Sequence, residues 1–183
     1  MYQRILACLL CALSVLPVCV AQSRRNVDRT TDVMCLVPVA GVAAAAWLSR
    51  DGAGAGQAAL AEGTALAANY LLELCVKKNR PDGSGQHAFP STHCAISASA
   101  ATSLWIRYGW KWGVPAAAVA GYVAWGRIYA RKHDAWDVLA GTAIGIGSAF
   151  AFVRRSPEGS RLTLQPLADP LTGTYALTAR LEF

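Results

Sequence analysis

Five long apolar segments follow residue 32, and each ends in charged residues or a turn signal. Their alanine-rich composition predicts helices and not strands. No low-complexity linker divides the chain, so we expect one all-α domain folded as a helical bundle. The predicted helices are Val33 to Ser49, Gly52 to Leu72 with Glu62 as an interruption, Thr92 to Ile106, Trp112 to Gly126, and Val138 to Val153.

Most of these helices are predicted to span a membrane. Charged residues make up 15% of the chain, against roughly 25% in soluble proteins, and five such helices leave few polar faces to meet water. Most are slightly shorter than the usual spanning length of roughly 20 residues, so a soluble helical bundle is the alternative. Tryptophans near segment ends fit an interfacial aromatic belt or, in part, the core: Trp105, Trp110, Trp112, Trp125 and Trp136.

The N-terminus has the pattern of an export signal. Arg4 precedes the apolar stretch Ile5 to Val20, and Cys19-Val20-Ala21 offers a small-residue cleavage site. Residues 1–21 are therefore predicted to be a signal peptide, with a retained anchor helix, the sixth of the bundle, as the alternative. The polar run Gln22 to Asp32 then forms the processed end.

The remaining chain divides into a helical domain, residues 22–155, and a polar C-terminal tail, residues 156–183. Alternating apolar residues from Tyr175 to Phe183 predict a short strand in the tail, one arm of a hairpin. Gly141, Gly145 and Ser148 recur at helical spacing, which lets neighbouring helices approach closely. Three cysteines that would remain after cleavage are predicted to be small buried residues and not a metal site: Cys35, Cys75 and Cys94.

With the signal cleaved, the orientation of the chain follows from counting helices. The loops from Lys77 to Ser91 and from Arg127 to Asp137 then share one outer face. This predicts a multi-pass protein of a bacterial inner membrane whose site faces the periplasm. Lysines and arginines occur in short groups at the ends of apolar runs and form no continuous stripe, so nucleic acid is excluded as a partner.

Phosphoryl-transfer chemistry is indicated by three polar clusters at the ends of the predicted helices. Fixed cations suit the phosphoryl oxygens, a histidine can attack phosphorus, and a second one can protonate the leaving oxygen. A four-residue spacing lets Asp137 accept a proton from one ring nitrogen of His133. The clusters are Lys77-Lys78-Asn79-Arg80-Pro81-Asp82-Gly83, Phe89-Pro90-Ser91-Thr92-His93, and Gly126-Arg127 followed by His133 and Asp137.

In order and spacing, these clusters resemble the three signature motifs of the type 2 phosphatidate phosphatase family, which includes bacterial acid phosphatases and vanadium haloperoxidases. The resemblance runs from about Val33 to Val153. It implies no metal or other cofactor. It also implies that His133 forms a phosphohistidine, that Asp137 orients it, that His93 protonates the leaving group and then activates water, and that Arg80, Arg127 and Ser91 hold the phosphoryl oxygens.

Three positions depart from the family pattern. Glu73 stands where the family has lysine, Thr92 where it usually has glycine, and Gly126 where it usually has serine. A carboxylate near a phosphate dianion reverses the expected interaction. We therefore expect Lys77 to supply the missing cation and to pair with Glu73 one helical turn away. Thr92 stays in the predicted phosphate-binding set, although it crowds the phosphate.

The function predicted from these residues is a metal-independent lipid phosphate phosphatase acting on a phosphomonoester or diphosphate. Phosphatidate, phosphatidylglycerol phosphate, an isoprenyl diphosphate and a lipid A phosphate are all candidate substrates. The alternatives are a lipid phosphotransferase or vanadate-dependent haloperoxidase on the same scaffold, or a catalytically weakened phosphate-binding membrane protein. The remaining loop charges are predicted to be solvated: Lys78, Asp82, His87, Arg131, Lys132 and Asp134.

Overall fold

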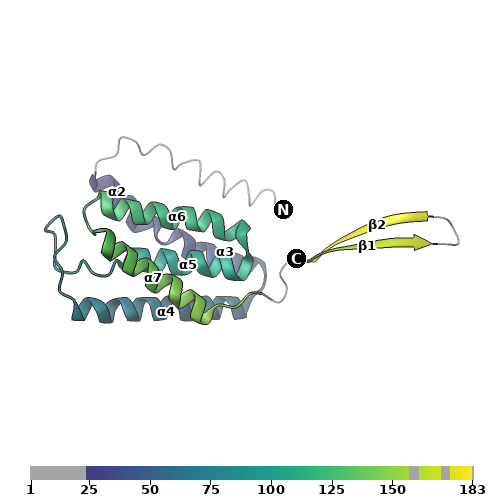
Figure 1. Cartoon of the computed structure of the whole chain (residues 1–183), viewed down its shortest axis with the longest axis horizontal. Coiled ribbons are helices and arrows are strands. Elements are labelled where there is room, and N and C mark those ends of the chain that lie inside the picture. The colour runs from purple at the N-terminus through teal and green to yellow at the C-terminus, as the bar shows by residue number, and fades with distance from the viewer. Residues whose placement is uncertain (1–23, 157–160, 170–173, 183) are drawn as a thin grey trace.

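The computed structural model describes residues 24–156, 161–169 and 174–182 (Figure 1). Within these ranges a bundle of helices precedes a two-stranded hairpin, so the predicted all-α bundle is confirmed. The predicted signal segment, residues 1–21, lies outside the described residues. The elements are α2 (Arg24–Met34), α3 (Val37–Leu48), α4 (Gly52–Cys75), α5 (Thr92–Tyr108), α6 (Trp110–Tyr129), α7 (Ala135–Phe152), β1 (Arg161–Asp169) and β2 (Thr174–Glu182).

Helices α3 to α7 correspond to the five predicted apolar segments, but α2 was not predicted. The polar run from Gln22 to Asp32 is helical from Arg24 onward, and its residues Val27 and Thr31 are buried. These two residues are four apart, so they share one helical face. That face packs against α6 at Gly126, where a Cβ atom would collide with Thr31. A polar helix is thus held by a narrow apolar contact.

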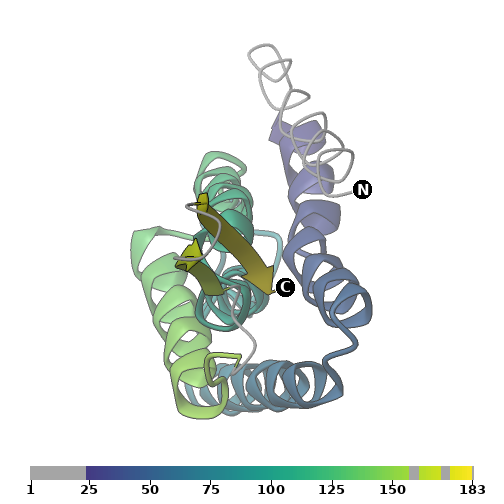
Figure 2. The ribbon, with the colours of Figure 1, turned by 90° about the vertical axis from the view of Figure 1, so that its right-hand side faces the viewer.

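Helix α5 lies at the centre of the bundle, with α3, α4, α6 and α7 packed around it (Figure 2). Small residues occupy much of its surface, among them Ala95 and Ser99, which are fully buried. Helix α7 packs against this surface of α5 through Gly141 and Gly145. A Cβ on Gly141 would fall well inside van der Waals contact with the Ser91 carbonyl, and one on Gly145 would do the same with the Ala95 carbonyl. The predicted small-residue stripe therefore brings two helix backbones together.

Large apolar side chains cover much of the outside of the bundle. Two helical stretches, Arg24–Leu48 and Ala135–Phe152, are long and apolar enough to cross a membrane by length and composition. Four of the five tryptophans near segment ends are exposed, whereas Trp112 packs against the core. Cys35 and Cys94 are buried as predicted, but Cys75, at the end of α4, is exposed, so that prediction was wrong for one of three.

The C-terminal tail forms an antiparallel hairpin. The predicted strand from Tyr175 to Phe183 corresponds to β2, and β1 is its partner arm. The register pairs Arg161 with Glu182 and Asp169 with Thr174.

The α5–α7 contact generates a stability prediction. We expect Gly145→Ala to destabilise the protein by about 1–3 kcal/mol, because the added methyl group has no space against the α5 backbone. Thermal unfolding in detergent measures the effect. Gly147→Ala is the matched control on the same helix: nothing lies within 4 Å of its Cβ position, so we expect no loss of stability, or a gain of about 0.5–1 kcal/mol. Equal midpoints for the two variants would contradict this packing.

Candidate active site

The predicted site residues gather at one end of the bundle, the left-hand end in Figure 1. Loop 76–91 connects α4 to α5 there, and loop 130–134 connects α6 to α7. Two salt bridges join the loops. The Lys78 ammonium lies 2.5 Å from the Asp134 carboxylate, and the Lys132 ammonium lies 2.8 Å from the Asp82 carboxylate. The prediction that these loops share one face of the bundle is confirmed.

His133 lies in the second loop and is buried, with 3% of its side chain exposed. Its Nδ1 atom is 2.7 Å from the carbonyl oxygen of Ala88 in the first loop. A carbonyl can only accept a hydrogen bond, so Nδ1 carries the proton and, in the neutral ring, Nε2 keeps its lone pair. Burial and the nearby positive charges of Arg127 and Arg80 lower the pKa of His133 to about 4. The ring is therefore neutral at physiological pH.

Asp137 has a different role from the predicted one. Its carboxylate is 3.9 Å from Nδ1 of His133, beyond hydrogen-bond distance, so it does not take the ring proton. Instead it accepts from Lys78 at 2.7 Å and from the backbone N–H of Asp134 at 2.9 Å. Asp134 and Asp137 form a capping box at the start of α7. Asp137 thus fixes the helix end and the first loop, and the Ala88 carbonyl orients the histidine.

Lys78, and not Lys77, carries its charge into the site. The Lys78 ammonium bridges Asp134 and Asp137, and these hydrogen bonds raise its pKa although burial alone would lower it. Lys77 is exposed. Glu73 pairs with His87, with its carboxylate 3.1 Å from Nδ1, so the predicted pair of Glu73 with Lys77 was wrong.

The orientation of the two lysines follows from the local backbone. Lys78 forms an isolated bridge with His87, and its carbonyl accepts from Ala88 at 3.1 Å. The chain is extended at this point, and successive side chains of extended chain point to opposite sides. Lys78 is paired with two carboxylates and 32% exposed, so the prediction that it is solvated was wrong, whereas the Asp134 side chain remains 41% exposed.

Arg127, in the last turn of α6, is 3% exposed and faces α2. Its Nη1 atom donates to Asp28 at 2.9 Å and to Asp32 at 2.8 Å. The Nε atom is buried and has no hydrogen-bond partner among the described residues. The backbone carbonyl of Arg127 accepts a hydrogen bond from the backbone N–H of His133 at 3.3 Å, which ties the position of Arg127 to that of the candidate nucleophile.

His93, Ser91 and Thr92 lie at the start of α5. The Nε2 atom of His93 is 3.0 Å from Asp32. Apart from a weak contact with the Cys94 thiol, the fully buried Ser91 hydroxyl has no hydrogen-bond partner among the described residues. The Thr92 hydroxyl accepts from Asn69 at 2.8 Å, so its side chain is committed to packing α5 on α4. Its backbone N–H still belongs to a helix N-terminus, where anions bind.

Arg80 lies in the first loop. Its Nε donates a long bond of 3.4 Å to the His87 carbonyl, and its charge is close enough to lower the pKa of His133. The other predicted loop charges are partly paired: Lys132 binds Asp82 and the Ser84 hydroxyl. Desolvation alone would raise the pKa of Asp82, but the hydrogen bonds that it accepts from Lys132 and from Ser84 hold this pKa below its ordinary value. Lys132 is thus paired and only 19% exposed, so the prediction that it is solvated was wrong, whereas Asp82 is an exposed residue, as predicted, although it is paired.

Sequence reasoning missed two groups of functional residues. Asp28 and Asp32 of α2 reach the site, and their four-residue spacing, which puts both carboxylates on one helical face, was the available signal. The Ala88 carbonyl leaves no such signal, because a backbone atom has no residue preference. Among the described residues, no group of three or more His, Cys, Asp or Glu side chains is arranged to hold a metal ion.

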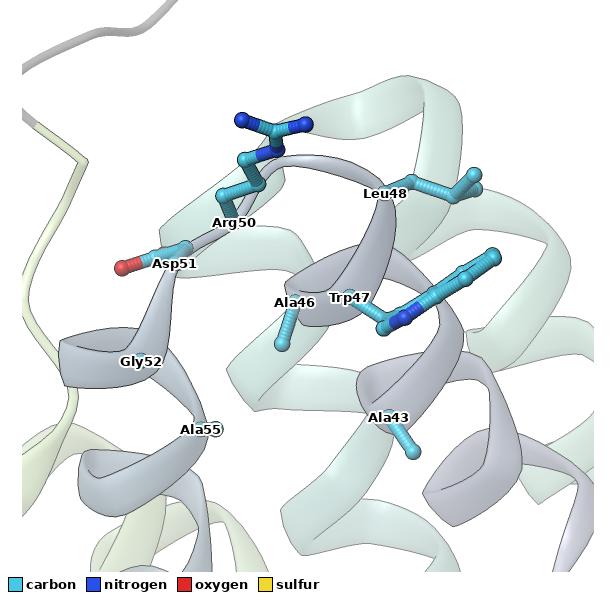
Figure 3. A pocket seen from close by; sticks show the side chains of 8 residues that line it. All are labelled: Ala43, Ala46, Trp47, Leu48, Arg50, Asp51, Gly52 and Ala55. Carbon is cyan, nitrogen blue, oxygen red and sulfur yellow. The ribbon is translucent and has the colours of Figure 1, made fainter.

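A hollow of about 670 Å³ lies elsewhere, at the turn between α3 and α4 (Figure 3). Its lining includes Trp47, Arg50 and Asp51, but none of the predicted site residues. The Asp51 carboxylate already accepts hydrogen bonds from Nη2 and Nε of Arg107, at 2.6 and 2.7 Å, and this pair fixes the turn. The hollow is therefore separate from the predicted site residues, which lie at the opposite end of the bundle.

Comparison with known proteins shows the family of the chain. A family model described as the PAP2 superfamily matches residues 58–160, which include the three motifs. A lipid A 1-phosphatase of Porphyromonas gingivalis is 37% identical over 70 residues, which are 37% of this chain and 16% of that protein's length. The match thus spans less than a fifth of this relative. No solved structure matches the chain.

The two adjacent lysines generate a test of the site. We expect Lys78→Met to lower activity about tenfold or more, because the fully buried Asp137 would lose its counter-charge. Lys77→Met is the control and should stay within about twofold of the unchanged protein, as an exposed charge does. Initial rates of phosphate release in detergent compare the two. A larger loss in Lys77→Met would restore the original expectation that Lys77 supplies the cation.

Proposed function

Because the chain belongs to the PAP2 superfamily, we propose that it removes a phosphate group from a lipid phosphomonoester or diphosphate through a phosphohistidine on His133. One observation carries the proposal: Nδ1 of His133 lies 2.7 Å from the carbonyl oxygen of Ala88, which can only accept a hydrogen bond, so the ring proton belongs on Nδ1. This leaves a lone pair on Nε2 of a buried neutral ring. A nucleophile needs that state, and an imidazolium could not attack phosphorus.

The proposed reaction has two steps. In the first, Nε2 of His133 attacks phosphorus, the bond from phosphorus to the lipid oxygen breaks, and His93 gives that oxygen its proton. In the second, a water molecule loses a proton to His93 and attacks the phosphohistidine, which releases inorganic phosphate and restores the His133 lone pair. His93 thus acts as acid and then as base.

Three groups are proposed to hold the phosphoryl oxygens. Arg127 offers its unpaired, buried Nε–H, and a guanidinium suits phosphate because it donates from a planar fork. Ser91 offers a buried hydroxyl at the N-terminus of α5, where free backbone N–H groups favour an anion. Arg80 offers a charge from the first loop. Lys78 supports the site indirectly, because it neutralises Asp137.

A lipid substrate is supported by the outside of the bundle and by the relative. Exposed apolar side chains such as Leu71, Leu139 and Phe150 cover α4 and α7, and such a surface suits contact with lipid acyl chains. The similar protein of Porphyromonas gingivalis is named a lipid A 1-phosphatase. We propose a bacterial inner-membrane location with the site on the periplasmic face, where a lipid phosphate can enter laterally.

Trapping the intermediate tests the proposal. We expect the full-length protein in detergent to release phosphate from at least one of a panel containing phosphatidate, phosphatidylglycerol phosphate, an isoprenyl diphosphate and lipid A. Radiolabelled phosphate should remain on the protein after an alkaline quench. His133→Gln should abolish both signals, with a rate loss on the order of 10⁴-fold or more.

His87→Gln is the matched control, because this exposed histidine lies at the same end of the bundle and its imidazole pairs with Glu73, whereas its contacts with Lys78 and Arg80 are made by the backbone, which the substitution keeps. It should behave as the unchanged protein does. Phosphate release by His133→Gln at the unchanged rate would contradict the assigned nucleophile. No release from any lipid would favour a phosphate-binding protein without catalysis.

A further inference from the structure

The acidic face of α2 occupies the groups that are proposed to bind phosphate. Asp32 places one carboxylate oxygen 2.8 Å from Nη1 of Arg127 and 3.0 Å from Nε2 of His93. Asp28 places an oxygen 2.9 Å from the same Nη1 atom. A single oxygen between an arginine and the general acid is the arrangement expected of a phosphate oxygen next to the leaving group. Asp32 therefore fills part of the place that a substrate needs.

Two carboxylates and a phosphate dianion cannot all share Arg127 without repulsion. Like charges this close repel each other strongly near a protein surface. Two other cations nearby are already engaged, Lys132 by Asp82 and Lys78 by Asp134 and Asp137, which leaves Arg80 as the further cation for a phosphate. Either a carboxylate moves away when phosphate arrives, or phosphate binds weakly.

The two aspartates differ in how firmly they are held. Asp28 is 23% exposed and lies 3.7 Å from a second cation, the Lys132 ammonium. Asp32 is 51% exposed, and Arg127 and His93 are the groups that hold its carboxylate. A half-exposed carboxylate is readily solvated by water when it swings out. Asp32 is thus the aspartate whose carboxylate can move away from Arg127.

The position of α2 depends on Gly126, the residue that precedes Arg127. A Cβ atom on Gly126 would collide with Thr31 and would come within 3.2 Å of Val27. The glycine therefore lets α2 lie directly beside Arg127. Gly126 stands where the resembled family usually has serine. The glycine in place of serine at position 126 therefore makes room for the helix that carries Asp28 and Asp32.

We propose that Asp32 is an internal occupant of the phosphate site, which the substrate phosphate displaces, whereas Asp28 stays on Nη1 of Arg127 and positions the guanidinium. The inference rests on the proposed function. It assigns Asp32 to setting affinity for the phosphate group, and Asp28 to holding the arginine so that its Nε–H stays directed to the ligand. Neither is a catalytic residue.

A pair of matched variants tests this, because Asp28→Asn and Asp32→Asn make the same change one helical turn apart. Binding of inorganic phosphate to the full-length protein is measured by calorimetry, and KM and kcat are measured with the best lipid. We expect Asp32→Asn to lower both the phosphate Kd and KM about three- to tenfold without lowering kcat. Asp28→Asn should raise both constants by a similar factor. Asp32→Glu, which keeps the charge, should not tighten binding.

The opposite results would overturn the proposal. A lower kcat at unchanged KM in Asp32→Asn would mean that Asp32 positions His93, and equal effects of the two Asn variants would mean that neither is displaced. If Asp32→Asn does not fold, Asp32→Ser must show the tighter phosphate binding instead. Phosphate binding needs no turnover, so tighter binding in a protein that hydrolyses no lipid would refute the proposed function alone. Hydrolysis without tighter binding would refute this inference alone.

Discussion

The site depends on the close approach of two helix backbones. Gly141 and Gly145 of α7 lie against the carbonyls of Ser91 and Ala95 on α5, at a separation that leaves no space for a Cβ atom. Because both helices begin at the same end of the bundle, this contact brings their N-termini together, and the Ser91 N–H donates to the Asp137 carbonyl at 3.0 Å. Loop 76–91, which leads into α5, is thereby held against loop 130–134, which leads into α7.

The charges at this end are arranged as a chain of pairs that surrounds a neutral histidine. Lys78 neutralises the buried carboxylate of Asp137, Lys132 neutralises Asp82, and Arg127 is met by α2. Buried charges are tolerated only when they are paired and hydrogen-bonded. Nε of Arg127 and, apart from its thiol contact, the Ser91 hydroxyl are among the buried groups that have no hydrogen-bond partner in the described part of the chain, and both are proposed to meet the substrate.

The sequence predicted the apolar helices and the convergence of the two loops, because hydrophobic segments and polar clusters can both be read along a chain. It could not predict which of two adjacent lysines turns inward, since that depends on the extended backbone around Lys78. It could not predict that a carbonyl, and not Asp137, orients His133. Helix α2 was missed because its polar composition hides the two-residue contact of Val27 and Thr31 with α6.

The state of the His133 ring is the central claim, and nitrogen-15 NMR of histidine-labelled protein in detergent measures it directly, with His133→Gln to assign the signal. At pH 7 we predict a neutral ring with the proton on Nδ1. The lowered pKa means that the imidazolium, which has no lone pair on Nε2, should form only as the pH falls through about 4. A proton on Nε2 in the neutral ring, or titration near the ordinary value of 6.5, would contradict a nucleophile held by the Ala88 carbonyl.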